Sequence, residues 1–212
     1  MSGVITHHVP DALLAAYAAG NLSHAFSVVV ASHVSMCPQC RAGLEAHRAV
    51  GGVLLEDTET VAVSSGLKDD ILSMLDAPFI PEPVYERSGV YPGPVMQALK
   101  GRAPRWKTLG MGVRQDILSK DKSGSVRLLH IQPGQAVPDH GHNGMELTLV
   151  LQGSFSDETG QFGVGDLEIA DEDLEHTPIA DDGGACICLA ATDARLRFNA
   201  IVPRLLQPVF RI

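Results

Sequence analysis

The spacing of apolar residues along the chain predicts helices in the first third and short strands in the second half. Helical spacing predicts four helices. The first covers residues 12–19 and is capped by Asp11, and the second covers 23–36 and is capped by Ser23. The third runs from just after Cys40 to about Leu55, and the fourth covers 67–75. The last of these has a mostly one-sided apolar stripe, as an amphipathic helix does. We therefore expect residues 1–77 to form a small helical domain.

The pattern changes twice after this helical part. Residues 77–94 contain five prolines, which favour extended backbone, so residues 78–94 are expected to be a linker. From Trp106 onward, short apolar runs alternate with Gly-rich turns and no long helical period remains. This pattern is typical of an antiparallel sandwich or barrel, expected over 95–212. The predicted fold class is α+β multidomain, a helical bundle followed by a β-barrel.

The composition of the chain argues against several classes of function. A net charge of −9 over 212 residues argues against a nucleic-acid surface and favours a basic protein partner. No apolar run reaches membrane-spanning length, and the first residues lack the basic start and apolar core of a signal peptide. We therefore expect a cytoplasmic protein with no membrane contact and no direct contact with nucleic acid.

The four cysteines come in two close pairs, which indicates metal or redox chemistry and not a disulfide framework. Cys186 and Cys188 face the same side of a predicted strand. They are either small apolar core residues, which we favour, or a redox pair.

The stretch H-V-S-M-C-P-Q-C places His33, Cys37 and Cys40 within eight residues. If the helix continues to Cys37, His33 lies one turn from it on the same face. Pro38 then ends the helix, and the C-x-x-C spacing lets Cys40 turn back toward the same point. Two thiolates and one imidazole suit zinc, which takes four ligands in a structural site.

The fourth ligand of this site is not decided by local spacing. His24 lies nine residues before His33 on the same predicted helix, too far along the axis to share one ion. His47 lies on a helix that leads away from the site. His7 and His8 precede the first helix on an arm that could fold back.

A second group of metal-capable residues lies in the strand-rich half. His140 and His142 are one residue apart on a predicted strand and so point to the same side. Glu146 follows the turn signal Asn143–Gly144, and a hairpin there would return it toward the histidines. His176 lies further on in a strand-like context. Two or three histidines with one carboxylate suit a divalent transition metal.

This second group resembles the cupin family. The first cupin motif, G-x5-H-x-H-x3-E-x6-G, matches residues 134–153 in every specified position. The second motif matches in part, with Gly165 and His176 aligned. Its Pro, Gly and Asn are replaced by Asp171, Asp173 and Ala180. The resemblance implies a small jelly-roll barrel that holds zinc or another divalent transition metal through His140, His142, Glu146 and His176.

The chain as a whole resembles the ChrR anti-sigma factors, a family with a zinc-binding anti-sigma domain followed by a cupin-like domain. The stretches H-H-V-P-D-A-L-L-A-A-Y-A-A-G-N-L and H-V-S-M-C-P-Q-C-R-A carry this resemblance, which extends to the C-terminal R-I. It implies structural zinc bound by His8, His33, Cys37 and Cys40. It also implies an extracytoplasmic-function sigma factor as partner in a heterodimer, clamped in part by the helix over 67–76.

The resemblance implies that the sigma factor is released on an oxidative signal, singlet oxygen or an organic hydroperoxide, and that the chain is not an enzyme. The alternative is a cupin metalloenzyme, of dioxygenase or isomerase type, with a helical zinc-binding appendage. A third possibility, a DNA-binding zinc finger, is disfavoured by the acidic balance and by the lack of a basic helix after Cys40.

Overall fold

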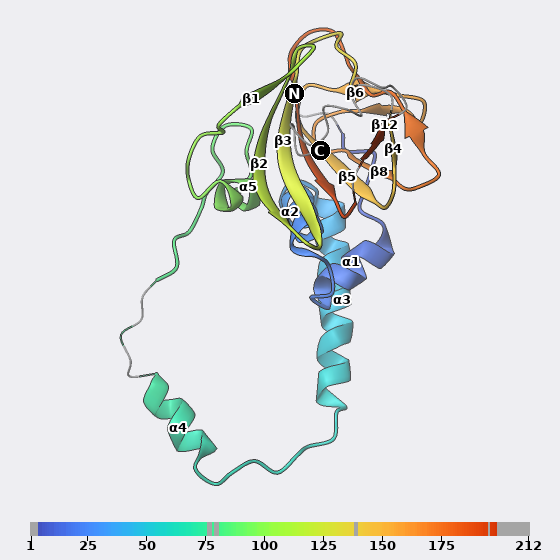
Figure 1. Ribbon diagram of the computed structural model, residues 1–212. Helices are drawn as coiled ribbons and strands as arrows, with labels where there is room; N and C mark the ends of the chain where they lie inside the picture. Colours follow the sequence, from blue (N-terminus) through green and yellow to red (C-terminus); the bar gives the residue numbers. More distant parts are fainter. Residues whose placement is uncertain (1–3, 76–77, 79–80, 138–139, 195, 199–212) are drawn as a thin grey trace.

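Helices come first along the chain and antiparallel strands follow, as the apolar pattern predicted (Figure 1). The structure, a computed structural model, describes residues 4–75, 78, 81–137, 140–194 and 196–198. The helices are α1 (Asp11–Ala18), α2 (His24–Met36), α3 (Pro38–Glu56), α4 (Leu67–Met74) and α5 (Gly93–Ala98). Among these described helices, none has the length and apolar composition needed to cross a bilayer.

The helix boundaries follow the predicted caps with two differences. Ser23 caps α2 as expected, because its Oγ accepts the Phe26 N–H at 3.4 Å. Asp11 is the first residue of α1 and not its cap, a position held by Pro10. Pro38 opens α3, where its missing N–H costs nothing, so Cys40 lies in the first turn of that helix and not in a connecting turn.

The strands form three antiparallel sheets. They are β1 (Lys107–Gly110), β2 (Val113–Asp121), β3 (Gly124–Ile131), β4 (His140–His142), β5 (Glu146–Gln152), β6 (Phe155–Ser156), β7 (Gln161–Phe162), β8 (Leu167–Ala170), β9 (Glu175–His176), β10 (Ile179–Ala180), β11 (Cys186–Thr192) and β12 (Leu196–Phe198). The large sheet has the order β1-β2-β3-β11-β5-β8, and the two small sheets are β10-β6-β7 and β12-β4-β9. The α+β fold class is confirmed.

The predicted hairpin after His142 is not formed. Strand β4 pairs with β9 and β12, whereas β5 pairs with β11 and β8 in the large sheet. Both edges of β5 are therefore occupied by other strands, which leaves no edge for β4. The turn at Asn143–Gly144 passes the chain from one sheet to the other.

The largest hydrophobic core lies between the helices and one face of the large sheet. Helix α2 packs on β3, β5 and β11, and it buries Phe26, Val29 and Val30 there. Strand β11 shows the two-residue period of a strand with both faces covered. Its Ile187, Leu189 and Ala191 face this helical core, and Cys186 and Cys188 belong to a second core inside the strands.

This arrangement bears on how the helical and β parts are connected. The main core contains buried residues from α1, α2, α3, α5 and the sheet, so it is continuous between the two parts. Helix α5, which was not predicted, begins inside the expected linker and packs on α2. The two parts are thus joined by packing as well as by the chain between them.

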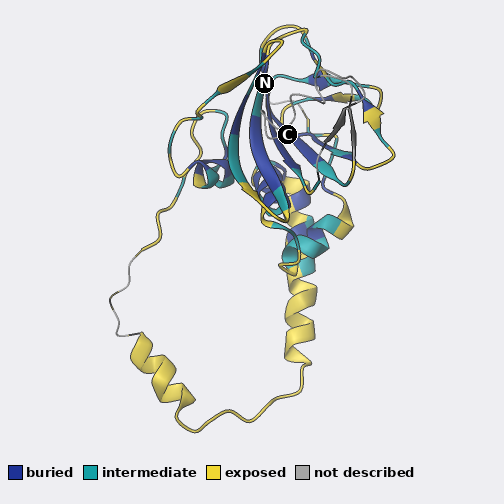
Figure 2. Ribbon diagram, viewed as in Figure 1, coloured by how far each residue is buried: buried dark blue, intermediate teal, exposed yellow. Residues whose placement is uncertain are grey.

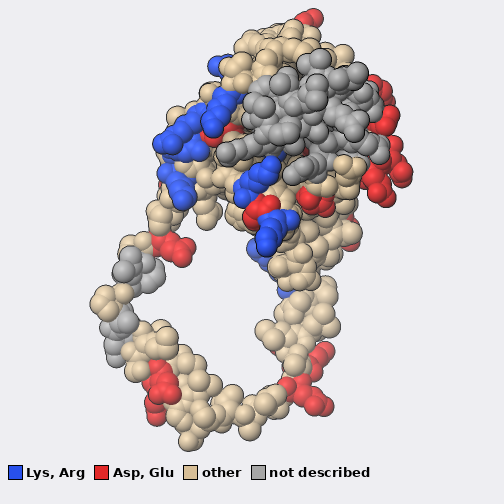
Figure 3. Space-filling model, in the orientation of Figure 1, with Lys and Arg blue, Asp and Glu red and all other residues tan. Residues whose placement is uncertain are grey.

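The second half of α3 and all of α4 project from this core (Figure 2). Helix α4 has no buried residue, and α3 buries only Cys40 and Leu44, both near its beginning. Basic side chains gather on the side of α5 and β1, while acidic side chains lie on the opposite side of the β part and at α4 (Figure 3). The surface of the projecting helices therefore exposes apolar side chains, and acidic side chains lie beside them at α4.

Candidate metal centres

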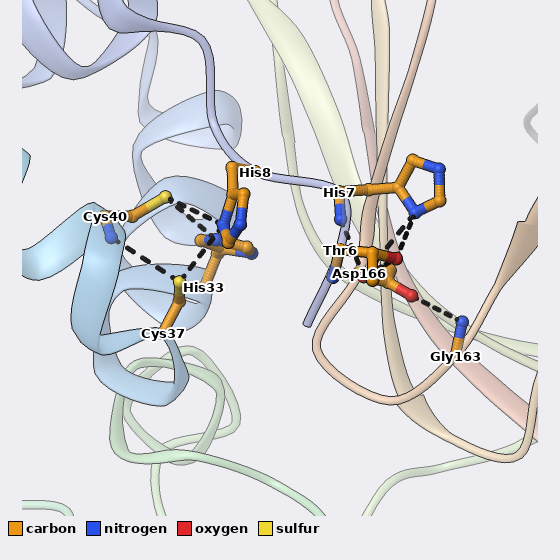
Figure 4. Close-up of polar contacts among 8 residues, drawn as sticks. All are labelled: Thr6, His7, His8, His33, Cys37, Cys40, Gly163 and Asp166. Carbon is orange, nitrogen blue, oxygen red and sulfur yellow. Dashed lines mark hydrogen bonds and ion pairs between the residues drawn. The ribbon is translucent and has the colours of Figure 1, made fainter. Parts of the chain in front are cut away.

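Four metal-capable side chains of the helical part meet at one point (Figure 4). His8 comes from the arm before α1, His33 from the last turn of α2, and Cys37 and Cys40 from the start of α3. The nearest donor atoms are His33 Nε2 and Cys40 Sγ at 3.2 Å, and His8 Nδ1 and Cys37 Sγ at 3.3 Å. His8 Nδ1 lies 3.7 Å from Cys40 Sγ, and all four donor atoms lie within 4.8 Å of one another.

These distances fit a tetrahedral zinc ion. With Zn–S bonds of about 2.3 Å and Zn–N bonds of about 2.0 Å, a tetrahedron places nitrogen and sulfur donors about 3.5 Å apart. The observed separations lie on either side of that value. The three nitrogen–sulfur separations, and the grouping of all four donor atoms within 4.8 Å, therefore fit a closed His2Cys2 structural site.

The protonation of the cluster also suits a metal. Burial lowers the pKa of His33 to about 4, so its imidazole is neutral and can act as a ligand. Burial raises the pKa of Cys40 to about 11, so without a metal its thiol keeps a proton that a zinc ion would displace. The buried Nδ1 of His33 makes no hydrogen bond to any described residue.

The structure distinguishes among the fourth-ligand candidates left open by sequence. His8 points into the cluster, whereas the neighbouring His7 points the other way, with its ring 4.4 Å from the ring of Phe162. His47 lies outside the cluster, where its Nε2 is 2.8 Å from an oxygen of Asp11. Of the described histidines, only His8 and His33 join the two cysteines.

A second cluster lies in the β part, around His176. The Nδ1 atom of His176 lies 2.7 Å from Asp157 Oδ2 and 3.0 Å from Glu168 Oε1, and all three side chains are nearly inaccessible to solvent. Since Nδ1 faces two carboxyl groups, Nε2 remains as the nitrogen that can bind a metal. The hydrogen bonds of a ligand histidine to carboxylates of this kind orient the ring.

The two carboxyl groups are close enough to share protons. Burial raises the pKa of Glu168 to about 8, and Asp157, which also hydrogen-bonds Glu168, keeps its charge. Burial by itself would lower the pKa of His176, but its bonds to Glu168 and Asp157 outweigh burial and raise it. The two carboxyl groups therefore favour the protonated imidazolium form of His176 when no metal is bound, and a metal on Nε2 would displace one of its two ring protons.

Sequence reasoning missed both carboxyl groups. Glu168 carried a usable signal, because a charged residue inside the apolar strand L-E-I-A must face the interior or be paired. Asp157 lies in a polar turn, S-D-E-T, that looks solvent-exposed in sequence. Only the position of that turn next to β9 brings Asp157 to His176.

The other three predicted ligands of this half are placed only in part. The backbone register pairs His140 with His176 across β4 and β9. The side chains of His140 and His142 lie outside the described residues. Glu146 lies on β5, where its Oε1 accepts the Thr148 hydroxyl at 3.0 Å. The four-residue metal set of the β part remains a prediction.

Two further groups line the inside of the β part. Arg127 is nearly buried and donates to Gln115 at 3.1 Å and to Ser125 at 2.8 Å, so a cation lies inside the β part. Cys186 and Cys188 are free thiols, fully buried, with their sulfurs 3.4 Å apart. The prediction that they are core residues is confirmed.

Comparison with known proteins extends these observations to the whole chain. The ChrR cupin-like domain family matches residues 96–194. The anti-sigma-E factor ChrR of Cereibacter sphaeroides is 56% identical over 211 residues, which span 98% of this chain and 99% of the relative. The crystal structure of Rhodobacter sphaeroides SigE in complex with the anti-sigma ChrR contains a chain with a TM-score of 0.81 and 55% identity, covering 90% of this chain and 100% of that chain. The chain therefore belongs to the family of ChrR anti-sigma factors.

Proposed function

We propose that this chain sequesters an extracytoplasmic-function sigma factor on the apolar surface of α3 and α4, and releases it on an oxidative signal received by the cupin half. Such a partner acts in transcription, which supports a cytoplasmic location for the chain. The observation that carries the proposal is the large apolar surface of the projecting helices. Its family relative is seen in complex with SigE, which supports a sigma factor as the occupant.

The apolar surface is defined by exposed large side chains of the projecting segment, which are Val50, Val53, Leu54, Leu55, Val61, Val63, Leu67, Ile71, Leu72, Met74 and Leu75. Soluble proteins rarely expose so many apolar side chains along one segment unless a partner covers them. An eight-residue helix such as α4 is also marginal by itself in water, so a partner would stabilise it. The segment is therefore suited to close around another protein.

Charge supports the same partner class. Asp69 and Asp70 lie beside the apolar residues of α4, and further acidic side chains lie near the far end of α3 (Figure 3). A protein with apolar grooves and a basic rim, as a polymerase-binding factor that also contacts DNA has, would complement this surface. The acidic balance of the whole chain points the same way.

The division of roles follows the expected domains. Residues 1–77 would hold the partner, with zinc bound by His8, His33, Cys37 and Cys40 fixing the helices and taking no part in chemistry. Residues 95–212 would receive the signal, singlet oxygen or an organic hydroperoxide. The ligands there would be His140, His142, Glu146 and His176, holding zinc or another divalent transition metal with open positions.

The chain is a regulator and not an enzyme, since it belongs to a family of anti-sigma factors. Membership of this family therefore argues against the alternative of a cupin metalloenzyme. In a regulator, a metal in the β part would matter because its binding or its oxidation changes the affinity of the chain for the partner. Such a signal must favour the released state by its differential affinity for the two states.

The first test places a charge on the apolar stripe of α4. Ile71 is 52% exposed, so about half of its side chain remains to be buried by a partner. Ile71→Asp loses that burial, about 1 kcal/mol, and adds an unpaired charge to the interface. We expect at least a hundredfold weaker binding to the sigma factors of the same cell when they are co-expressed and co-purified.

Ser73→Asp is the matched control, because it adds the same charge to the polar side of the same helix. Equal sigma-factor binding by the two variants would contradict the proposed surface. A full chain that captures none of the candidate sigma factors would contradict the proposed function altogether.

The second test concerns the signal. Glu146→Gln should leave sigma-factor binding within about threefold of the wild type, because Glu146 lies in the β part away from α3 and α4. The same variant should blunt release on exposure to singlet oxygen or an organic hydroperoxide. If Glu146→Gln emptied the metal site of the β part and the sigma factor were still released normally, the cupin half would not be the sensor.

A further inference from the structure

The arm that carries His8 has no regular structure, and the cupin half holds it in place (Figure 4). Asp166 Oδ1 accepts the N–H of Thr6 at 2.7 Å and the N–H of His7 at 2.8 Å. The Leu167 N–H donates to the His7 carbonyl at 3.1 Å. The residue just before the ligand His8 is therefore held through both of its backbone polar groups.

Asp166 is itself fixed from its own side. It is 4% exposed, and its second oxygen accepts the Gly163 N–H at 2.9 Å, which closes the turn between β7 and β8. The adjacent Gly165 lets the arm come close, because a Cβ there would lie 2.6 Å from Ile5 Cδ1. The arm thus packs against a rigid turn through a contact that a larger residue at Gly165 would prevent.

Strand β8 begins immediately after Asp166, and it reaches the second candidate centre two residues later. Glu168 Oε1 lies 3.0 Å from Nδ1 of His176. The backbone between Asp166 and Glu168 spans a single residue, Leu167, which bonds the arm. One three-residue stretch therefore contacts the arm of His8 at one end and the predicted cupin ligand His176 at the other.

We propose that Asp166 is a positioning residue that holds His8 in the N-terminal metal centre, and that β8 thereby couples that centre to the cupin site. A change at His176 that displaces Glu168 would also displace Asp166, loosening the arm and the fourth ligand of the centre. The inference rests on the proposed zinc centre and adds how the cupin half would act on it. It involves no contact between the sigma factor and the cupin half.

The test measures alkylation of individual cysteines in the zinc-loaded full-length chain, located by peptide mass spectrometry. Cys37 and Cys40 report on the N-terminal centre, and Cys186 and Cys188 are internal references in the β part. Asp166→Ala should label Cys37 and Cys40 at least tenfold faster than the wild type, with the reference cysteines unchanged.

Asp181→Ala is the matched control for this variant. Asp181 is likewise a carboxylate that accepts several hydrogen bonds, but its donors are the side chains of Ser154, Ser156 and Gln161 of the β part, at 2.6, 2.8 and 2.8 Å. It should leave the labelling of the N-terminal cysteines at the wild-type rate. Equal rates for Asp166→Ala and the wild type would overturn the positioning role.

A variant on the arm guards against damage to the cupin fold. His7→Pro removes the N–H that Asp166 accepts and changes no residue of the β part, whereas His7→Ala removes only the ring. We expect faster labelling of Cys37 and Cys40 in His7→Pro alone. If the Asp166→Ala chain also exposed the reference cysteines, the His7 pair would decide the result by itself.

Two more comparisons separate the steps of the inference. Glu168→Ala, which removes the carboxyl group that contacts Nδ1 of His176, should accelerate labelling of the N-terminal cysteines as well, and a wild-type rate would overturn the coupling through β8. A chelator should accelerate their labelling in the wild type. If the chelator did not accelerate labelling, the proposed zinc centre would be wrong. If the chelator accelerated labelling but Asp166→Ala had no effect, only the positioning role of Asp166 would be contradicted.

Discussion

Loss of the proposed N-terminal metal centre should unfold part of the helical region while leaving the rest folded. The perturbation is Cys40→Ala, which removes one of the four donors from a cluster whose closest nitrogen–sulfur contact is 3.2 Å. Helix α1 buries only Leu14, and α3 buries only Leu44 besides Cys40. These two helices therefore have little apolar burial of their own.

The magnitude follows from that burial. A fully buried leucine contributes about 1.5–3 kcal/mol, so the two leucines supply roughly 3–6 kcal/mol. Structural zinc contributes on the order of 10 kcal/mol in finger peptides, which is more than both leucines together. Without the metal, the backbone entropy of ordering α1 and the start of α3 is no longer offset.

Helix α2 should behave differently. It buries eight residues, among them Phe26, Val29 and Val30, against the large sheet as well as against its neighbouring helices. That contact does not depend on the metal. We therefore expect amides of α1 and of the first turns of α3 to lose protection in Cys40→Ala, while amides of α2 and β11 keep theirs.

The assay is hydrogen exchange read by mass spectrometry on the full chain, with and without added zinc. Wild-type chain treated with a chelator should match Cys40→Ala. His47→Ala is the control, since His47 is a histidine of α3 outside the cluster, and its exposed contact with Asp11 is worth less than about 1 kcal/mol. Unchanged protection of α1 in zinc-loaded Cys40→Ala would refute the reasoning, as would simultaneous loss of α2.

Two further predictions concern the scaffold. Ser23→Ala should cost about 1 kcal/mol of stability in urea unfolding because it removes the cap of α2, and an unchanged midpoint would show that packing alone sets where this helix begins. Asp116→Ala should cost about 1.5–3 kcal/mol, since its buried carboxylate accepts the Arg102 side chain at 2.7 Å and the Arg105 N–H at 2.8 Å. Asp121→Ala, at an exposed turn, should shift thermal unfolding far less, and equal shifts would contradict the importance of burial at Asp116.

Several features were predictable because they depend on residues close together in the chain. His33, Cys37 and Cys40 lie within eight residues, at the end of α2 and the start of α3, so their convergence depends on one short connection and little on the rest of the fold. The four N-terminal helices were predicted from periodicity and caps, with errors of up to three residues at their ends, the largest at the start of α3. The family resemblance read from the motifs is confirmed by the full-length relative.

Other features failed because a strand pairs with whatever the fold brings beside it. The expected hairpin between His142 and Glu146 had good turn residues, but β5 is paired on both sides by β8 and β11. Helix α5 begins in a proline-rich stretch that looked extended, because a proline near a helix start is compatible with either structure.

The sequence alone predicted a zinc-type cluster that includes His33, Cys37 and Cys40, and a cupin motif after it, because both patterns are defined by residues close together in the chain. The tertiary structure decided which distant groups complete them. His8 enters the first cluster on an arm tied to Asp166, 160 residues from Thr6, and Asp157 contacts His176 from 19 residues earlier in the chain. Spacing specifies neighbours within a turn or a strand, whereas contacts between separate segments exist only once burial has brought those segments together.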